Sequence, residues 1–535
     1  MSTKKYIPAY TLLILSLMSI LSCNKNLDIK NTKELENTYF ETEYRITQGI
    51  GAAYAEITNI YGPDLANQSK HGFWLLPADD ITADGTGNPL ETFSGLNGSN
   101  NSVRTMWITY YKIIARCNFM LDKIDGGELD AIYKTPGLKE ANKAEMLFIR
   151  SWSNFKLWDN WRKAPLQTKR ITSVADAVLP PSEGFQLIDN AIASLETAAP
   201  LARDSWDNSN MGRITSDACY GLLVKLYVTR ACYNSRNGGD YAKAITAYNM
   251  ISPGRIAVFT SIPFGNSFDY RNENNAESLF EFQSSLQPGG QDNAWLDNDF
   301  GNDVGQMGAF YHYGDAHWSN YVSGIFGPSP KLLSAYDSMD IRKDETFRGS
   351  NVENFGGSYF WINPSWGKFG NHQLVKYTNG ERGKVLDPSN QIGSNNNPRL
   401  LRLADIKLCV AEAYLATGDV SSALAQVNDV RERARNSVSP ASEAPAALQD
   451  VTMADIMKER LLELAGEDGH RWSDLKRWHA AGYINLANWT AADWGFPYDD
   501  NLFKFNVSRN LLFPIPTDEL ERNPLMSASG QNPGY

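Results

Sequence analysis

Apolar residues recur at three- and four-residue spacing along much of the chain, the pattern of helices that bury one face. Between residues 141 and 161, for example, Leu147, Phe148, Phe155 and Trp158 fall on one such face. The pattern predicts helices over 101–124, 141–161, from Pro180-Pro181-Ser182 to about Ala198, and over 216–233, 401–417, 451–464 and 472–481. We therefore expect a protein that is mainly α-helical.

Two stretches repeat each other, 239–248 and 418–427. Each begins with Gly-Asp, has Ala five residues after the Gly, and follows one of the predicted helices. We expect the Gly to end the first helix, the Asp to cap the second, and the Ala to let the two helices approach closely. This arrangement resembles the turn and second helix of a tetratricopeptide unit. The wide separation of the copies suggests a helical-repeat scaffold interrupted by insertions.

The segment 261–400 has a different character. It holds 22 of the 62 aromatic residues and 17 of the 41 glycines, with many Asn and few helical periods. Long irregular segments inside a folded protein tend to carry function. Loops rich in Gly, Trp and Tyr suit a binding surface for an uncharged polar ligand, although each ring could instead pack its loop onto the helices.

The chain begins with a segment that we interpret as a secretory signal peptide, residues 1–22. Lys4 and Lys5 precede an uncharged apolar run that ends at Leu21, and Ser22 stands before Cys23. The run is too short to span a membrane as a helix. A Cys at the cleavage point resembles the bacterial lipobox, so we expect Cys23 to be lipid-modified and to hold the mature protein on a membrane.

The remaining 513 residues are acidic, with 48 basic against 61 acidic side chains. This balance argues against nucleic acid as a partner and against electrostatic binding to anionic headgroups. The four later cysteines, at 117, 219, 232 and 409, lie in apolar helical stretches and read as buried free thiols. A Cys219–Cys232 bridge is the alternative.

Sequence patterns of known catalytic sites are absent, including GxSxG, HExxH and GxxxxGK[ST]. A glycosidase would need two facing carboxylates, for which Asp79-Asp80, Asp297/Asp299 and Glu467-Asp468 are candidates. His312 and His317 read as hydrogen-bonding groups rather than a metal pair. We predict no cofactor and no metal site. Structural calcium at 297–303 has only a weak signal, because the spacing differs from an EF-hand.

The C-terminal third carries a family resemblance. It contains KERLLEL at 458–464, EDGHRWSDLKRW at 467–478, LFPIP at 512–516 and QNPGY at 531–535. These blocks, with Cys23–Asp28, Phe40, Ala53-Tyr54 and 164–166 on the N-terminal side, closely resemble the SusD/RagB family of outer-membrane lipoproteins of Bacteroidetes. We expect the blocks to be structural, with Arg471 and Asp474 paired within a helix turn and Trp472 and Trp478 packed on the scaffold.

The resemblance implies one SusD-like domain over 23–535. Its tetratricopeptide-like scaffold would comprise about 23–260 and 400–535, and its loop-rich ligand face about 261–400. Such proteins are not enzymes: they sit on the cell surface, bind glycans and pass them to a SusC-like TonB-dependent transporter. By position in the family, the ligand-binding candidates are Trp74, Asp80, Phe93, Trp295, Tyr311 and Trp318. The aromatic rings would stack on sugars, and Asp80 would accept hydrogen bonds from hydroxyls.

Three alternatives remain open. A peptide-binding, RagB-like surface protein would offer unpaired sheet edges or charged end pockets. A surface glycosidase would show turnover. A structural lid of the transporter without its own ligand would bury its loop aromatics.

Overall fold

The computed structural model describes residues 39–61, 69–83, 87–283, 326–349, 372–374, 376–377 and 396–535. The α-helices, in chain order, are α3 (Glu43–Glu56), α4 (Thr58–Tyr61), α5 (Ser69–Leu75), α6 (Pro89–Thr92), α7 (Asn101–Asp125), α8 (Leu138–Trp161), α9 (Val174–Ala177), α10 (Gln186–Ala198), α11 (Ser216–Tyr233), α12 (Gly238–Tyr248), α13 (Pro253–Ala257), α15 (Pro330–Ala335), α16 (Ile341–Thr346), α17 (Leu403–Ala416), α18 (Val420–Asn436), α19 (Met453–Leu464), α20 (His470–Ala480), α21 (Val507–Asn510), α22 (Thr517–Arg522) and α23 (Pro524–Ser529).

Short 3-10 helices are η1 (Asn208–Asn210), η2 (Phe259–Ser261), η3 (Phe264–Phe268), η4 (Tyr270–Asn272), η7 (Leu486–Asn488) and η8 (Asp500–Leu502). The strands are β1 (Ile81–Ala83), β2 (Ser278–Glu281), β3 (Phe326–Pro328), β4 (Phe347–Gly349), β5 (His372–Leu374) and β6 (Arg399–Arg402). The prediction of a mainly helical, tetratricopeptide-like fold is confirmed.

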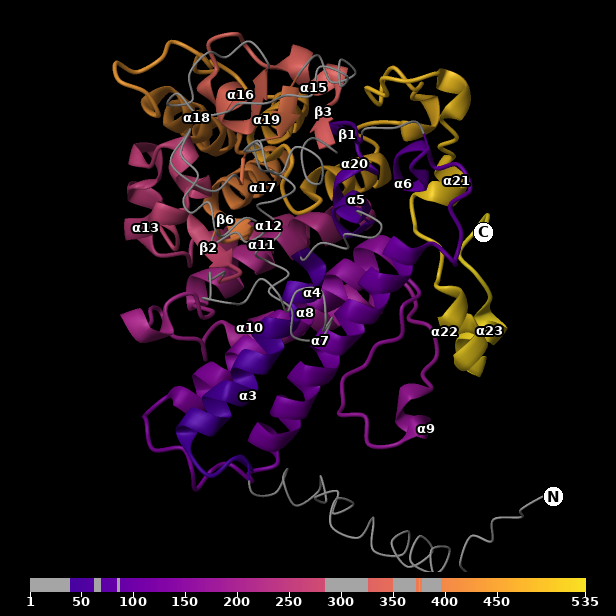
Figure 1. Cartoon of the computed structure of the whole chain (residues 1–535). Helices are drawn as coiled ribbons and strands as arrows, with labels where there is room; N and C mark the ends of the chain where they lie inside the picture. The colour runs from indigo at the N-terminus through magenta and orange to yellow at the C-terminus, as the bar shows by residue number, and fades with distance from the viewer. Residues whose placement is uncertain are drawn as a thin grey trace, which may run out of the picture.

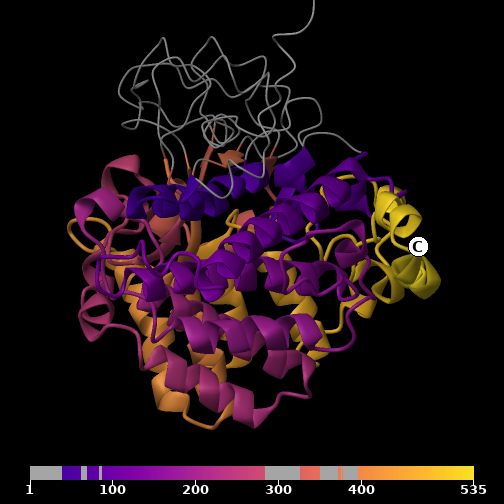
Figure 2. The ribbon, with the colours of Figure 1, turned by 90° about the horizontal axis from the view of Figure 1, so that it is seen from below.

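Consecutive long helices pack on one another. α3 lies against α7 and α8, α8 against α10, α10 against α11, and α12 against α17. Figure 2 shows the result as layers, whose colours pass from indigo through purple and magenta to orange across the molecule. The predicted helix over 216–233 matches α11, and α7, α8, α17 and α19 start or end within three residues of their predicted limits. Local periodicity was therefore a sufficient guide to these elements.

The two repeat copies form helical hairpins, α11–α12 and α17–α18, that pack side by side through α12 and α17. In the second copy Gly418 ends α17 at φ +87° and Asp419 caps α18, as predicted. In the first copy both parts of the prediction are wrong. α11 ends at Tyr233 and Gly239 lies within α12, where the side chain of Asn237 accepts the hydrogen bond from the Asp240 amide. Asp240 lies inside α12 instead, where it forms an ion pair with Arg230 at 2.6 Å.

The small residue of each repeat behaves as expected. Ala244 and Ala423 are both fully buried, and the second helix of each hairpin packs against the first. The four cysteines after Cys23 are buried and free, so the alternative Cys219–Cys232 bridge is excluded. None of the helices in the described ranges has the length and apolarity needed to span a membrane.

Within the described residues, three two-stranded antiparallel sheets pair strands that no short hairpin turn connects. β1 pairs with β3, with Thr82 opposite Gly327; β2 pairs with β6; and β4 pairs with β5. β1 belongs to the N-terminal half, whereas β3, β4 and β5 belong to the 261–400 segment. The sheets therefore attach described parts of this segment to each other and to the helical scaffold.

Candidate functional site

Three of the predicted ligand-binding residues lie in the described structure, on the stretch that runs from α5 through β1 to the end of α6. Trp74 is 6% exposed, Asp80 4% and Phe93 2%. Stacking on a sugar requires an open ring face. These three side chains are buried in the folded chain, so they do not present an open face to a ligand.

Phe93 occupies the aromatic core. It ends α6 in the left-handed region at φ +57°, and its ring lies 5.0 Å from Phe505, 5.9 Å from Trp494 and 6.1 Å from Trp472. The stacking role that the family position suggested does not fit this environment, because other rings surround Phe93. The C-terminal segment 489–505 supplies most of them.

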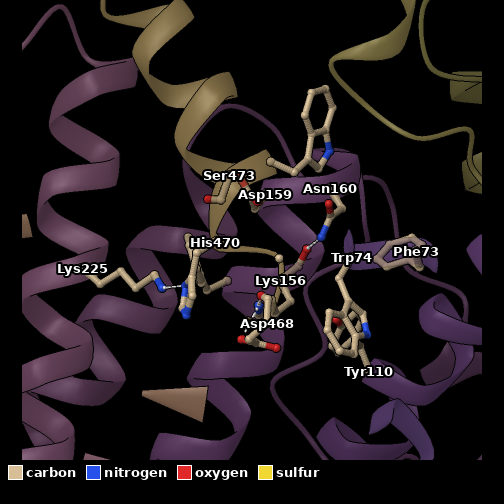
Figure 3. Close-up of a pocket in the computed structure, with 13 residues that line it drawn as sticks. Phe73, Trp74, Tyr110, Lys156, Asp159, Asn160, Lys225, Asp468, His470 and Ser473 are labelled. Atoms are coloured by element: carbon tan, nitrogen blue, oxygen red, sulfur yellow. Dashed lines mark hydrogen bonds and ion pairs between the residues drawn. The ribbon is translucent and has the colours of Figure 1, made fainter. Parts of the chain in front are cut away.

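Trp74 lines a small cavity with residues of α7, α8, α11 and α20 (Figure 3). Its backbone lies against Gly469, where an added Cβ would come within 2.9 Å of the Trp74 Cβ. Gly469 also adopts φ +66°, a conformation that favours glycine. The EDGH stretch of the C-terminal third is therefore fitted against the predicted N-terminal loop.

The pKa values of Asp79 and Asp80 are shifted in opposite directions in the fold. Burial would raise the pKa of Asp79, but Arg471 and Lys331 outweigh it and lower this pKa to about 2. The Arg471 Nε lies 2.5 Å from Asp79 Oδ1, and Lys331 Nζ lies 2.6 Å from Oδ2. Burial, followed by the charge of Asp79, raises the pKa of Asp80 to about 7. Asp80 accepts a hydrogen bond from the Gly466 amide at 3.3 Å.

This geometry corrects the expectation of an Arg471–Asp474 pair. Arg471 reaches across to Asp79, while Asp474 pairs with Arg460 at 2.7 Å and with Arg477 at 2.8 Å. Trp472 and Trp478 are buried at 3% and 0% exposure, so their predicted packing on the scaffold is confirmed.

A buried ionic cluster holds the 261–400 segment to the scaffold; we call it the Glu463 cluster. Glu463, on α19, contacts Arg402 of β6 at 2.7 Å, Arg342 of α16 at 3.0 Å, and Arg433 of α18. The cluster also includes Asp340, Glu277, Lys376, Glu459 and Glu467. Burial would raise the pKa of Glu463, but the arginines outweigh it and hold this pKa far below its usual range.

The Glu463 cluster explains why charges are concentrated in the KERLLEL block. Glu459 and Glu463 of this block pair with buried arginines, namely Arg342, Arg402 and Arg433. Each arginine is at most 1% exposed, and an unpaired charge at such depth would be strongly destabilising. The block is thus structural, in agreement with the sequence interpretation.

The cavity beside Trp74 is lined by paired polar groups. Lys156 Nζ lies 2.8 Å from Asp468 Oδ2, and Lys225 donates to His470 Nδ1 at 2.6 Å (Figure 3). Asp159, which also lines the cavity, pairs with Lys476 at 3.0 Å. Burial and then Lys225 lower the pKa of His470 far below its usual value. The volume, about 20 Å³, suits about one water molecule and not a sugar ring.

The remaining predicted site residues, Trp295, Tyr311 and Trp318, lie outside the described residues. So do Cys23, His312, His317 and the acidic stretch 297–303. Among the residues that the structure describes, no group of three or more His, Cys, Asp or Glu side chains is arranged to hold a metal ion.

The sequence interpretation missed the aromatic segment 489–505, which encloses Phe93. Its signal was present in the dense run of Trp489, Trp494, Phe496, Phe503 and Phe505. Nothing in that run indicated which part of the chain it covers. Trp489 is half-buried, and Lys331 lies 4.0 Å over its ring, next to the Asp79 ion pair.

Comparison with known proteins identifies the family. Residues 276–535 match the model of the SusD family, and residues 25–228 match that of a family described as "Starch-binding associating with outer membrane". The chain belongs to the SusD/RagB family.

Individual relatives match over nearly the whole length. SusD-like protein P25 of Formosa agariphila is 23% identical, over 97% of this chain and 98% of the relative. The solved structure of a SusD homolog from Bacteroides thetaiotaomicron has a TM-score of 0.75 at 20% identity and covers 94% of this chain and 99% of that one. A structure described as a laminarin-binding SusD-like protein has a TM-score of 0.69 at 20% identity, covering 92% and 100%.

Proposed function

We propose that this chain is a cell-surface glycan-binding lipoprotein that captures oligo- or polysaccharide and passes it to a SusC-like TonB-dependent outer-membrane transporter. The observation that carries the proposal is the match of residues 25–228 and 276–535 to SusD-type family models, together with a similarly folded protein described as laminarin-binding. The family description that matches residues 25–228 also names starch binding and the outer membrane. Cys23 is the proposed lipidation site.

The ligand contacts in this proposal come from Trp295, Tyr311 and Trp318, whose rings would stack on sugar faces. We assign Trp74, Asp80 and Phe93 a structural role instead of direct contact with the ligand. Their burial and their contacts with the C-terminal third support a role in holding the base of the ligand face. The Glu463 cluster supports the same arrangement, because it ties residues 342, 376 and 402 to α18 and α19.

We propose binding without turnover. Three of the four carboxyl groups in the pairs Asp79-Asp80 and Glu467-Asp468 are committed to cations: Asp79 to Arg471, Glu467 to Arg402, and Asp468 to Lys156. A glycosidase needs a proton-donating carboxyl and a second carboxylate on opposite sides of a bound sugar. The buried setting of these residues leaves no room for a sugar between them.

The test is retarded migration of residues 24–535 in native gels cast with a panel of polysaccharides, laminarin and starch included. We expect one glycan class to retard the protein. Trp295→Ala and Trp318→Ala should each weaken retardation about tenfold, which corresponds to about 1.4 kcal/mol. Trp206→Ala is the matched control, since Trp206 is half-buried on the scaffold against Arg213 at 3.8 Å.

The outcomes separate the candidate functions. Retardation by no polysaccharide would contradict glycan binding and favour a peptide ligand or a structural lid. Release of reducing sugar from the retarding glycan would contradict binding without turnover. For the anchor, Cys23→Ala should move the full-length protein out of the membrane fraction of its own cells; an unchanged distribution would exclude lipidation at Cys23.

A further inference from the structure

An apolar tip projects from the connection between α8 and α10. We call residues 171–177, which contain α9, the α9 tip. Val174 is 85% exposed and Ile171 44%, and Ala175 and Ala177 are exposed as well. In the view of Figure 1, α9 stands clear of the helical body. Exposed apolar side chains on a projecting element indicate an interaction site more strongly than scattered ones do.

The connection is held firmly at both ends. On the α8 side, the Tyr111 hydroxyl donates to the Pro165 carbonyl at 2.7 Å, and Asn118 Nδ2 donates to the Gln167 and Lys169 carbonyls, both at 3.1 Å. On the α10 side, Asn523 Nδ2 donates to the Leu179 carbonyl at 2.9 Å. The tip is therefore presented from fixed supports.

The tip is also ordered within itself. Asp176 accepts hydrogen bonds from the Thr172 and Ser173 amides, each at 2.8 Å, and closes a capping box. These bonds, the Thr172 amide first, lower the pKa of Asp176 to about 2. Asp176 is thus charged at neutral pH, two residues from Val174. A pre-ordered element loses little conformational entropy when it enters a partner's pocket.

The position of the tip relates it to the membrane side of the molecule. Figure 1 shows α9 and the start of α3 at the same, lower end of the molecule in this view. Fifteen residues lie between Cys23 and Tyr39, and the connection can reach at most roughly 55 Å. A lipid on Cys23 would therefore hold the start of the described chain within this distance of the membrane in which the proposed transporter lies.

Two observations favour a protein pocket over the lipid itself. The fixed carboxylate of Asp176 would be costly to bring into hydrocarbon beside Val174, whereas a protein surface can leave it hydrated. The mature chain carries 61 acidic against 48 basic side chains, which opposes adsorption to anionic headgroups.

We infer that the α9 tip docks on the transporter, with Ile171 and Val174 inserted into an apolar pocket on its outward face. The inference rests on the function proposed above, because that function supplies the partner. The tip would then fix the orientation of the protein over the channel, separately from ligand binding in the 261–400 segment.

The test is co-purification from the protein's own cells in mild detergent. The full-length lipoprotein carries an affinity tag in the stretch between Cys23 and Tyr39, and the recovered transporter is identified by mass spectrometry. We expect the wild type to recover a TonB-dependent transporter and the double variant Ile171→Asp/Val174→Asp to recover at least about tenfold less. The matched control is Met339→Asp, at a side chain that is 58% exposed on another part of the surface.

A second measurement identifies the contact. A photoreactive benzoylphenylalanine at position 174 should cross-link to the transporter, and one at position 339 should not. Equal recovery of the transporter by wild type and double variant overturns the inference, as does cross-linking at 174 to lipid alone. If the wild type itself recovers no transporter, the part of the proposed function that names a transporter as partner is contradicted. The double variant should match the wild type in glycan retardation and in thermal melting. These two controls exclude misfolding as the cause of reduced transporter recovery.

Discussion

Glu463 offers the sharpest test of how the 261–400 segment is attached to the scaffold. Replacing it by Gln keeps the side-chain shape but removes the negative charge that faces three buried arginines, at 342, 402 and 433. Breaking a buried ion pair by removing one partner costs about 3–5 kcal/mol. The arginines keep other carboxylates, namely Asp340 and Glu459 for Arg342, Glu277 and Glu467 for Arg402, and Glu277 for Arg433.

Because these partners remain, we expect the lower end of the range, about 3 kcal/mol. Since 1.4 kcal/mol is tenfold in an equilibrium constant, that cost makes local opening roughly 100-fold more frequent. Hydrogen exchange of residues 24–535, resolved by peptide mass spectrometry, measures this opening at β6 and α19. Amides of α7 and α10, far along the chain from the cluster, provide the internal reference.

Asp125→Asn is the matched control for this experiment. It removes the partner of Lys143, in a pair whose side chains are 53% and 32% exposed, and such surface pairs contribute about 0–1 kcal/mol. Its exchange at β6 and α19 should equal that of the wild type. If Glu463→Gln also leaves this exchange unchanged, the charge of Glu463 does not stabilise the attachment, and the reasoning from buried charge is refuted.

Three further predictions concern single residues. Burial raises the folded-state pKa of Asp80 to about 7, above its unfolded value near 4, so the stability that this carboxyl contributes is lost as pH rises from about 4 to 7. Relative to the wild type, Asp80→Asn should therefore remove a loss of roughly 3 kcal/mol between pH 5 and pH 8, measured by urea unfolding; an equal change in the two proteins would contradict this. Phe93→Ala should destabilise the protein by about 3–5 kcal/mol but leave glycan retardation in native gels unchanged at low temperature. Trp295→Ala should instead weaken retardation and leave stability unchanged. Weakened retardation of a stably folded Phe93→Ala protein would show that Phe93 contacts the ligand. Asp419→Ala should cost about 0.5–2 kcal/mol through loss of the α18 cap in urea unfolding, and Ser at 419 should recover most of it; no recovery would mean that the cap does not act.

The sequence alone was enough to determine most of the long helices and the family, although it missed α3 and placed the start of α10 too early. The spacing of apolar residues marked α11 and α19, and Gly418-Asp419 marked the turn between α17 and α18. These features depend on neighbours within a few residues, which act through backbone hydrogen bonds and one buried face. The C-terminal blocks that carried the resemblance are largely buried in this chain, with Glu463, Trp472 and Trp478 among their buried residues.

Only the tertiary structure decided which distant groups meet. Arg471 could have paired with Asp474 one turn away, but the fold brings Asp79 to 2.5 Å, from almost 400 residues earlier in the chain. As an aromatic residue in a predicted loop, Phe93 was a candidate to stack on a ligand, but in the fold the segment 489–505 covers it. A side chain's burial depends on what packs over it, and the local sequence carries no record of that partner. Whether an aromatic ring serves a ligand or the core is therefore settled by packing.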